Sequence, residues 1–251
     1  MEGVFLKEIF SSIQGEGPWV GERQIFVRFI GCDIHCRYCD TPVSIQHAPD
    51  EVNQSYCSVQ TSLSGIQFEQ VKNPISIDAL SQYCSRLIVP GQSKPTISLT
   101  GGEPLMQTEF LKEWLPLLAG IFRIYLETNG LHADAVQDII GMVDIISMDF
   151  KLPSATGLQP FWEAHKKFLL AAIGKTIFIK VVVTTDTSPD DIITAARIIA
   201  EFDHDILLVI QPAHGSLAPS SPLLMTFQEA ALGTIPNVRI IPQVHKILHV
   251  P

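Results

Sequence analysis

Residues 24–42, QIFVRFIGCDIHCRYCDTP, place three cysteines directly behind an apolar, β-rich run. The spacing C-x3-C-x2-C is formed by Cys32, Cys36 and Cys39, and the other two cysteines, Cys57 and Cys84, form no second close pair. Closed zinc sites and ferredoxin-type iron–sulfur clusters take four protein ligands. Three cysteines alone would leave one iron of such a cluster free to bind a small molecule. The motif therefore predicts an iron–sulfur cluster with one open iron.

The cysteine spacing is also compatible with two simpler arrangements. Zinc accepts both thiolate and imidazole ligands, so a zinc site completed by His35, His47 or Cys57 has the same cysteine spacing. Three ordinary buried thiols fit it as well. The spacing favours the open cluster and excludes neither alternative.

Short β-rich runs alternate with helix-like segments from Gln24 onward, which predicts an α/β fold. Helical spacing follows Ser76, and again Ser188, where a proline and two acidic residues suit a helix N-terminus. Nearly continuous apolar strands predict a parallel sheet, open or curled into a barrel. The expected strands are residues 24–30, 96–100, 122–127, 143–150, 176–184, 205–211 and 238–242.

The chain length of 251 residues suits one α/β domain over residues 1–251, with no internal repeat. Residues 44–73 are polar and weakly periodic, so we expect a long loop or small inserted element there, after the cysteine loop. Such a domain buries enough surface to fold without disulfides.

Composition excludes several classes of protein. Lys and Arg number 17 against 26 Asp and Glu, a net charge of −9, which argues against a nucleic-acid partner. No run reaches the roughly 18 apolar residues of a membrane span. The N-terminal MEGVFLKEIF lacks the basic start and apolar core of a signal peptide. We expect a cytoplasmic protein with reduced cysteines that acts on a small molecule.

Polar residues gather behind the expected strands. In parallel α/β folds the active site lies at the carboxyl ends of the strands. Turns and caps alone would not bring so many polar groups to one edge, so the pattern predicts an active site there. The groups are TGGEP (100–104), ETNG (127–130), Ser147, Asp149, Lys151, QPAHG (211–215) and QVHK (243–246).

The TGGEP segment has its own chemistry. Gly101 and Gly102 let the backbone approach a ligand closely, and Glu103 can accept hydrogen bonds from an ammonium group. The same residues also fit a plain strand-to-helix turn. With the three cysteines, the chain resembles the radical S-adenosylmethionine (SAM) superfamily, whose signature is CxxxCxxC after the first strand and GGE after the second.

This resemblance implies a [4Fe–4S] cluster on Cys32, Cys36 and Cys39, with SAM chelating the open iron. Chemistry would proceed through a 5′-deoxyadenosyl radical, so no residue is assigned as an acid or base. An internal Asp149–Lys151 pair and a loop-capping Asp40 are the alternatives for those residues. The implied SAM contacts are Tyr38, Cys39, Asp40, Gly102, Glu103, Ser147, Met148, Asp149 and Gln211.

The segment EIFSSIQGEGPWVGERQIFVRFIGC, with CDT and the final PQVHK, resembles the 7-carboxy-7-deazaguanine synthase family. The resemblance implies a partial (β/α)6 barrel, a homodimer, Mg²⁺ bound near Thr41, and an electron donor such as flavodoxin or ferredoxin. The implied activity is that of a carbon–nitrogen lyase, which contracts 6-carboxy-5,6,7,8-tetrahydropterin to 7-carboxy-7-deazaguanine with loss of ammonia, on the route to queuosine. Another radical SAM enzyme, such as an activase, and a zinc-stabilised non-catalytic protein are the alternatives.

Substrate binding is expected along SIQGEG, residues 12–17, whose amide, carboxylate and glycines suit a pterin edge but also fit a polar turn. Arg28 lies in an apolar strand, where an unpaired charge is costly. A substrate carboxylate or an ion pair with Glu8, Glu16 or Glu22 would explain it. The full set implied by the resemblance is Ile13, Gln14, Gly15, Glu16, Arg28, Thr100, His245 and Pro251.

The last ten residues, PQVHKILHVP, follow the final expected strand. Ile247, Leu248 and Val250 are apolar enough to hold this tail on the protein. It leaves the active-site edge, so we expect His245 and the carboxylate of Pro251 over the substrate, with a solvent-facing tail as the alternative. We expect ordinary surface or core roles for His132, His165, His204 and His249.

Overall fold

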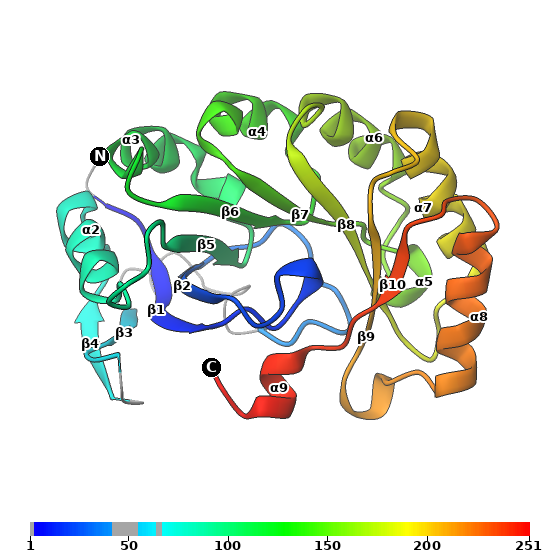
Figure 1. Ribbon diagram of the computed structural model, residues 1–251, viewed down its shortest axis with the longest axis horizontal. Coiled ribbons are helices and arrows are strands. Elements are labelled where there is room, and N and C mark those ends of the chain that lie inside the picture. Colours follow the sequence, from blue (N-terminus) through cyan, green and yellow to red (C-terminus); the bar gives the residue numbers. More distant parts are fainter. Residues whose placement is uncertain (1–2, 42–54, 64–66) are drawn as a thin grey trace.

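The computed structural model describes residues 3–41, 55–63 and 67–251. Within this part the strands form one curved sheet in the order β10-β9-β8-β7-β6-β5-β2-β1-β3-β4 (Figure 1). The strands are β1 (Leu6–Ile13), β2 (Arg23–Phe29), β3 (Tyr56–Gln60), β4 (Phe68–Lys72), β5 (Thr96–Gly101), β6 (Arg123–Thr128), β7 (Ile145–Asp149), β8 (Thr176–Val183), β9 (Leu208–Pro212) and β10 (Val238–Ile240). The α-helices are α2 (Ile77–Arg86), α3 (Thr108–Leu118), α4 (Ala133–Ile139), α5 (Pro153–Thr156), α6 (Trp162–Ala171), α7 (Pro189–Phe202), α8 (Ser221–Leu232) and α9 (Val244–Leu248).

The strands β2 and β5 to β10 pair in parallel, each with its neighbour in the sheet. In Figure 1, α3, α4, α6, α7 and α8 lie along the outer face of the curved sheet, while α9 and the turn after β1 lie on its inner side. This is a partial barrel, open on one side. The predicted α/β fold with a parallel sheet is confirmed.

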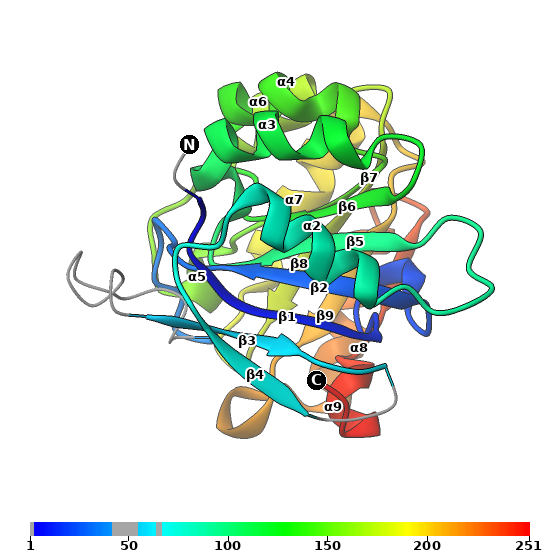
Figure 2. The ribbon, with the colours of Figure 1, turned by 90° about the vertical axis from the view of Figure 1, so that its left-hand side faces the viewer.

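Each of the seven expected strands is present, with ends that differ from the expected ones by at most three residues. The strand β1, antiparallel to β2, was not among them. Neither was the β3–β4 hairpin, which extends the sheet beside β1 (Figure 2). The hairpin lies inside the expected loop or insertion at residues 44–73, of which 44–54 and 64–66 lie outside the described residues. The edge strand β4 is half-buried or exposed throughout, so its sequence carries little hydrophobic alternation.

Helix starts follow the expected capping residues. The side chain of Ser76 accepts a hydrogen bond from the Ala79 amide at 3.2 Å, and α2 begins at the next residue. At α7 the Ser188 side chain accepts from the Asp190 amide at 3.2 Å, behind a proline at the first helical position. Both satisfy a backbone donor that the helix leaves unpaired.

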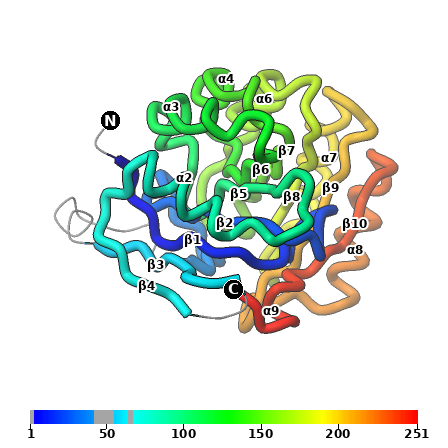
Figure 3. Tube along the Cα trace, turned by 60° about the vertical axis from the view of Figure 1, so that its left-hand side comes forward, coloured from blue at the N-terminus to red at the C-terminus, as the bar shows by residue number. Residues whose placement is uncertain are grey.

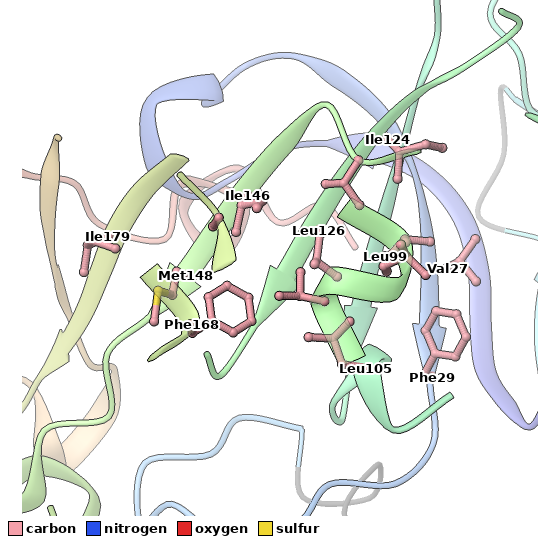
Figure 4. Close-up of a cluster of buried hydrophobic side chains, with 14 of the residues drawn as sticks. Val27, Phe29, Leu99, Leu105, Ile124, Leu126, Ile146, Met148, Phe168 and Ile179 are labelled. Atoms are coloured by element: carbon pink, nitrogen blue, oxygen red, sulfur yellow. The ribbon is translucent and has the colours of Figure 1, made fainter. Parts of the chain in front are cut away.

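The core lies between the sheet and the outer helices. Alternate residues of the parallel strands, among them Val27, Leu99, Leu126 and Ile179, belong to the same buried cluster as Phe168 of α6 (Figure 4). Burying each such side chain contributes about 1.5–3 kcal/mol. The residues between them in sequence point the other way, because successive side chains of a strand face opposite sides. The inner side of the sheet therefore receives a different set, with polar residues lining the cavity and a small apolar cluster of Tyr125, Ile145, Phe178 and Val209.

The final helix brings the end of the sequence to its beginning. Its first residue, Val244, donates a backbone hydrogen bond to the Gly15 carbonyl at 2.9 Å. Figure 3 follows this tail, in red, as it crosses the inner side after β10. It thereby covers the turn that follows β1.

Candidate active site

A cavity of about 510 Å³ opens on the inner side of the sheet. It is lined mainly by the carboxyl ends of the strands, the cysteine loop and the tail. All but two of the residues predicted to bind cluster, magnesium, SAM or substrate line it. These are Ile13, Gln14, Gly15, Glu16, Arg28, Cys32, Cys36, Tyr38, Cys39, Asp40, Thr41, Thr100, Gly102, Ser147, Asp149, Gln211, His245 and Pro251.

The cysteine loop leaves β2 and carries its three half-buried thiols into one wall of the cavity. Burial raises the pKa of Cys32 to about 11 and also raises that of Cys36. Metal binds the thiolate form of cysteine. A bound cation is therefore needed to favour the thiolate over the thiol in this loop. Thr41 lies beside them, its Oγ1 3.8 Å from the Cys39 Sγ.

The three cysteines of the loop do not form a preformed site for a single metal ion. In the described part of the chain, no three His, Cys, Asp or Glu side chains surround a common point for a single metal ion. A cubane cluster needs no such point, because each cysteine binds a different iron. Cys57, considered above as a zinc ligand, lies fully buried in the core, and His47 lies outside the described residues.

Glycines explain how the loop meets the next strand. A methyl group at Gly102 would overlap the carbonyl of Gly31, and Gly101 has φ +118° against the backbone of Phe29. The Glu103 amide donates to the Gly31 carbonyl at 2.7 Å. Only glycine permits this close approach, so TGGEP holds the start of the cysteine loop.

Glu103 itself is turned away from the cavity. It is fully buried, and its carboxylate accepts hydrogen bonds from the Leu105 amide (3.1 Å), the Thr128 hydroxyl (2.8 Å) and the Asn129 amide (2.7 Å). Burial raises its pKa despite these donors. Glu103 caps the turn at Pro104–Gln107, as the strand-to-helix alternative for TGGEP required. In this structure the Glu103 carboxylate is therefore not positioned to make its predicted contact with the SAM amine.

Met148 is the other predicted residue that does not line the cavity. Its side chain is fully buried in the outer core, where Figure 4 shows it near Phe168. Ser147 and Asp149, its neighbours in β7, face the cavity because side chains alternate along a strand. A SAM contact at Met148 would therefore have to come from its backbone.

Two histidines that were expected to have ordinary roles brace this region. His132 Nε2 lies 3.1 Å from Asp33 Oδ2, and the side-chain amide of Asn129 donates to Asp33 Oδ1 at 3.0 Å, so the segment after β6 is bonded to the cysteine loop. His165 is fully buried and stacks on Phe150 at 4.4 Å between ring centroids. Burial lowers the pKa of His165 to about 4, so the ring is neutral.

Arg28 lines the cavity and pairs with Glu8, its register partner in β1. The Arg28 Nε lies 2.6 Å from Glu8 Oε1, and both side chains are partly exposed. The structure thus contains one of the ion pairs considered from sequence. This pair uses Nε, so the two Nη groups are left to bind a carboxylate in the cavity.

The SIQGEG segment forms a hydrogen-bonded wall. Gln14 donates to Glu127 Oε1 at 3.0 Å and accepts from the Glu16 amide at 3.0 Å. Glu127 also accepts from the Thr100 hydroxyl at 2.6 Å. Amide, carboxylate and hydroxyl are therefore held side by side, the arrangement needed to recognise the edge of a heterocycle.

A chain of buried charges crosses the cavity floor. Glu16 Oε2 lies 2.6 Å from the Lys180 ammonium, which lies 3.4 Å from Asp149 Oδ2, and Asp149 is 2.9 Å from the Lys151 ammonium. Burial alone would lower the pKa of Lys180, but Glu16 and Asp149 raise it above its ordinary value. Lys180 was not among the predicted residues. The sequence feature that indicated Arg28 is also present here, because Lys180 is a charged residue within the apolar strand TIFIKVVV.

The tail closes the opposite side. Gln243 donates to Glu16 Oε1 at 2.6 Å and to Asp40 Oδ2 at 3.0 Å, and Lys246 pairs with Asp40 at 2.9 Å. His245 packs against Gly15 so closely that a methyl group there would overlap it. Burial lowers the pKa of His245. The predicted approach of His245 and Pro251 to the cavity agrees with their place in its lining.

Two buried acceptors in the cavity are suited to bind a ligand. Asp149 Oδ1 and Gln211 Oε1 are buried, and the described residues provide no hydrogen-bond donor for either. Buried oxygens of this kind are costly unless a ligand supplies donors. Hydroxyl and ammonium groups such as those of SAM would satisfy them, so the residues present fit that cofactor beside the cysteine loop.

Comparison with known proteins identifies the family. The sequence profile of the Radical SAM superfamily matches residues 26–185. The 7-carboxy-7-deazaguanine synthase of Geobacter sulfurreducens is 38% identical over 255 residues, covering 98% of this chain and 97% of the relative. The chain belongs to the 7-carboxy-7-deazaguanine synthase family. The enzyme of that name from Thermococcus kodakarensis is 32% identical, with 98% and 99% covered.

Similarity to a solved structure supports the fold of this family member. The crystal structure of QueE from Escherichia coli aligns with a TM-score of 0.56 over 94% of this chain and 93% of that one, at 19% identity. Membership in the radical SAM superfamily makes the chain a radical SAM enzyme that uses a [4Fe–4S] cluster and SAM. This decides against the zinc-stabilised non-catalytic alternative.

In the described residues, no helix has the length and apolarity needed to span a membrane.

Proposed function

We propose that this protein is a 7-carboxy-7-deazaguanine synthase, which contracts 6-carboxy-5,6,7,8-tetrahydropterin to 7-carboxy-7-deazaguanine with loss of ammonia. One observation carries the proposal: the cysteine loop and the SIQGEG wall, both parts of the family resemblance, line the same cavity. An activase would need the cysteines and GGE but has no reason for a polar wall suited to a heterocycle. The full-length similarity to relatives of this name supports the same choice.

The cysteine side of the cavity is the cofactor side. When bound there, the [4Fe–4S] cluster and SAM would supply radical chemistry for hydrogen abstraction from the substrate. Cys32, Cys36 and Cys39 would hold the cluster, and the Thr41 hydroxyl would be a ligand of Mg²⁺, which prefers oxygen and keeps several waters. The SAM contacts in the cavity are Tyr38, Cys39, Asp40, Gly102, Ser147, Asp149 and Gln211.

The opposite side binds and orients the pterin. The Nη groups of Arg28 would bind the substrate carboxylate in a bidentate manner. Gln14, Glu16 and Thr100 present acceptors and donors to the ring edge, and His245 and Pro251 close over it from the tail. Holding the reacting carbon against the cofactor side in this way supplies the orientation that radical chemistry needs.

The proposal includes the setting of the reaction. The enzyme acts as a homodimer in the cytoplasm, receives electrons from flavodoxin or ferredoxin, and feeds a 7-deazapurine pathway such as that to queuosine. The net charge of −9 agrees with a small-molecule substrate in place of a nucleic acid.

The test is anaerobic reconstitution with iron and sulfide, followed by incubation with SAM, dithionite, Mg²⁺ and the pterin. Formation of 7-carboxy-7-deazaguanine, identified by mass spectrometry, is the expected result. Formation of 5′-deoxyadenosine without that product would leave a radical SAM enzyme with another substrate. The Cys36→Ala protein serves as the control that cannot support turnover.

A further inference from the structure

Lys180 is a buried cation between the two walls of the cavity. Its side chain projects from β8 and is 10% exposed, while those of Glu16 and Asp149 are 15% and 11% exposed. Its ammonium lies 2.6 Å from Glu16 and 3.4 Å from Asp149. Glu16 belongs to the wall assigned to the pterin and Asp149 to the wall assigned to SAM. One side chain therefore touches both binding regions.

The two carboxylates depend on Lys180 to different degrees. Asp149 has a second cation, Lys151, at 2.9 Å. Glu16 has, besides Lys180, only the neutral amide of Gln243 at 2.6 Å among its side-chain partners in the described structure. A buried carboxylate that loses its cation keeps the full cost of desolvation. Removal of Lys180 would therefore disturb Glu16 more than Asp149.

We propose that Lys180 is a positioning residue for the reaction, which keeps Glu16 ionised and fixed against the pterin while Asp149 anchors the lysine on the SAM wall. This rests on the proposed function, because it takes the ligand of Glu16 to be a pterin. An ionised carboxylate accepts hydrogen bonds from ring N–H and amino groups through both oxygens, whereas a protonated one loses acceptor capacity. The role of Lys180 is exerted through Glu16.

The proposal has a distinct pH signature. Burial would raise the pKa of Glu16, but Lys180 and Gln243 outweigh it and hold the pKa below its ordinary value. Glu16 is then ionised across the neutral range, and its contribution to pterin affinity is constant. Without the lysine, burial raises the pKa, so pterin affinity falls as pH decreases. The other charged or titratable groups acting on Glu16 are Asp40 of the cysteine loop, His245 of α9 and Tyr125 of β6.

The experiment compares wild type with Lys180→Met, Glu16→Gln and the double variant, each with its cluster reconstituted. The dissociation constant of 6-carboxytetrahydropterin is measured anaerobically by calorimetry from about pH 5 to about pH 8. Glu16→Gln keeps His245 but has no titratable group at position 16, so a pH dependence that Lys180→Met shows and Glu16→Gln lacks is assigned to Glu16. Lys180→Met should bind the pterin about 10- to 100-fold more weakly at the acidic end, and less so at the basic end.

Three comparisons separate this role from a structural one. The double variant should bind no more weakly than Glu16→Gln, since Lys180 acts through Glu16. Lys180→Arg keeps the cation and should restore a flat pH profile. Lys166→Met breaks the Lys166–Glu201 pair on the outer helices α6 and α7 and should leave the pterin affinity and its pH dependence as in wild type. If Lys180→Met does not fold, Lys180→Gln carries the same test.

Unaltered affinity with a flat profile in Lys180→Met, or additive losses in the double variant, would overturn the role of Lys180. A wild type that binds SAM but no pterin would overturn the proposed function, and this role with it. Pterin binding by wild type, with loss confined to low pH in Lys180→Met, supports both.

Discussion

Replacing Gly15 with Ala should displace the tail from the cavity. The added methyl group would lie 2.7 Å from the Cβ of His245, where ordinary contacts begin at 3.4 Å. A rotamer change cannot relieve this overlap, because Cβ is attached to the backbone. The first turn of α9 must therefore move by about 0.7 Å, and the Val244–Gly15 hydrogen bond of 2.9 Å lengthens or breaks.

The expected effect is on substrate binding more than on folding. Misplacement of a site by about 1 Å can cost 100-fold, so we expect the KM for the pterin to rise about 10- to 100-fold. None of the residues of α9 is buried, so the tail can move outward and the fold loses little. Overpacking at its lower limit, about 1 kcal/mol, corresponds to a fall in Tm of about 2–4 °C.

Steady-state kinetics with reconstituted enzyme, together with iron content and thermal unfolding, would test this. The matched control is Gly141→Ala, where the added methyl group meets nothing within 4 Å. A KM equal to that of wild type in Gly15→Ala, with the same cluster content, would refute the placement of His245 against this turn.

Three further predictions concern single side chains. Cys36→Ala should lose cluster iron and SAM cleavage while Cys84→Ala, buried in the outer core, keeps both; iron analysis that finds a full cluster in Cys36→Ala would contradict this. Arg28→Lys should retain uncoupled SAM cleavage but raise the pterin KM about 10- to 100-fold, because an ammonium cannot pair with Glu8 and also bind a carboxylate through two parallel hydrogen bonds. An unchanged KM would assign Arg28 to the ion pair alone. Thr41→Ala should raise the Mg²⁺ concentration for half-maximal activity and Thr41→Ser should not, and identical magnesium titrations of all three proteins would remove Thr41 as a ligand.

Much of the site could be predicted because parallel strands deliver their carboxyl ends to one edge. Arg28 was found as a charge within an apolar strand, and its place in the cavity agrees with that reasoning. Lys180 carries the same signal within TIFIKVVV and would have been found by the same rule. Side chains alternate along β7, so Ser147 and Asp149 face the cavity and Met148 does not. Assigning all three residues to SAM from the family resemblance overlooks this alternation.

Other parts depend on contacts that no local pattern contains. The bond from Gln243 to Glu16 joins residues 227 positions apart. Two of the three donors on Glu103 come from Thr128 and Asn129 at the end of β6, so its orientation away from the cavity follows from tertiary packing. The polar edge strand β4 is stabilised by pairing with β3 and has little hydrophobic signal of its own.

The cavity is lined by the segment after β1, by β8 and by the tail. Only the complete fold brings these three parts together. An unfolded chain has no remnant of this site to which a pterin could bind. A ligand that binds only the folded state raises the free energy of unfolding by about 2.7 kcal/mol at 100 times its Kd. Substrate should therefore slow proteolysis of the whole barrel, including α2 and β4 far from the cavity. Protease resistance would then report binding even in preparations whose cluster cannot be reduced.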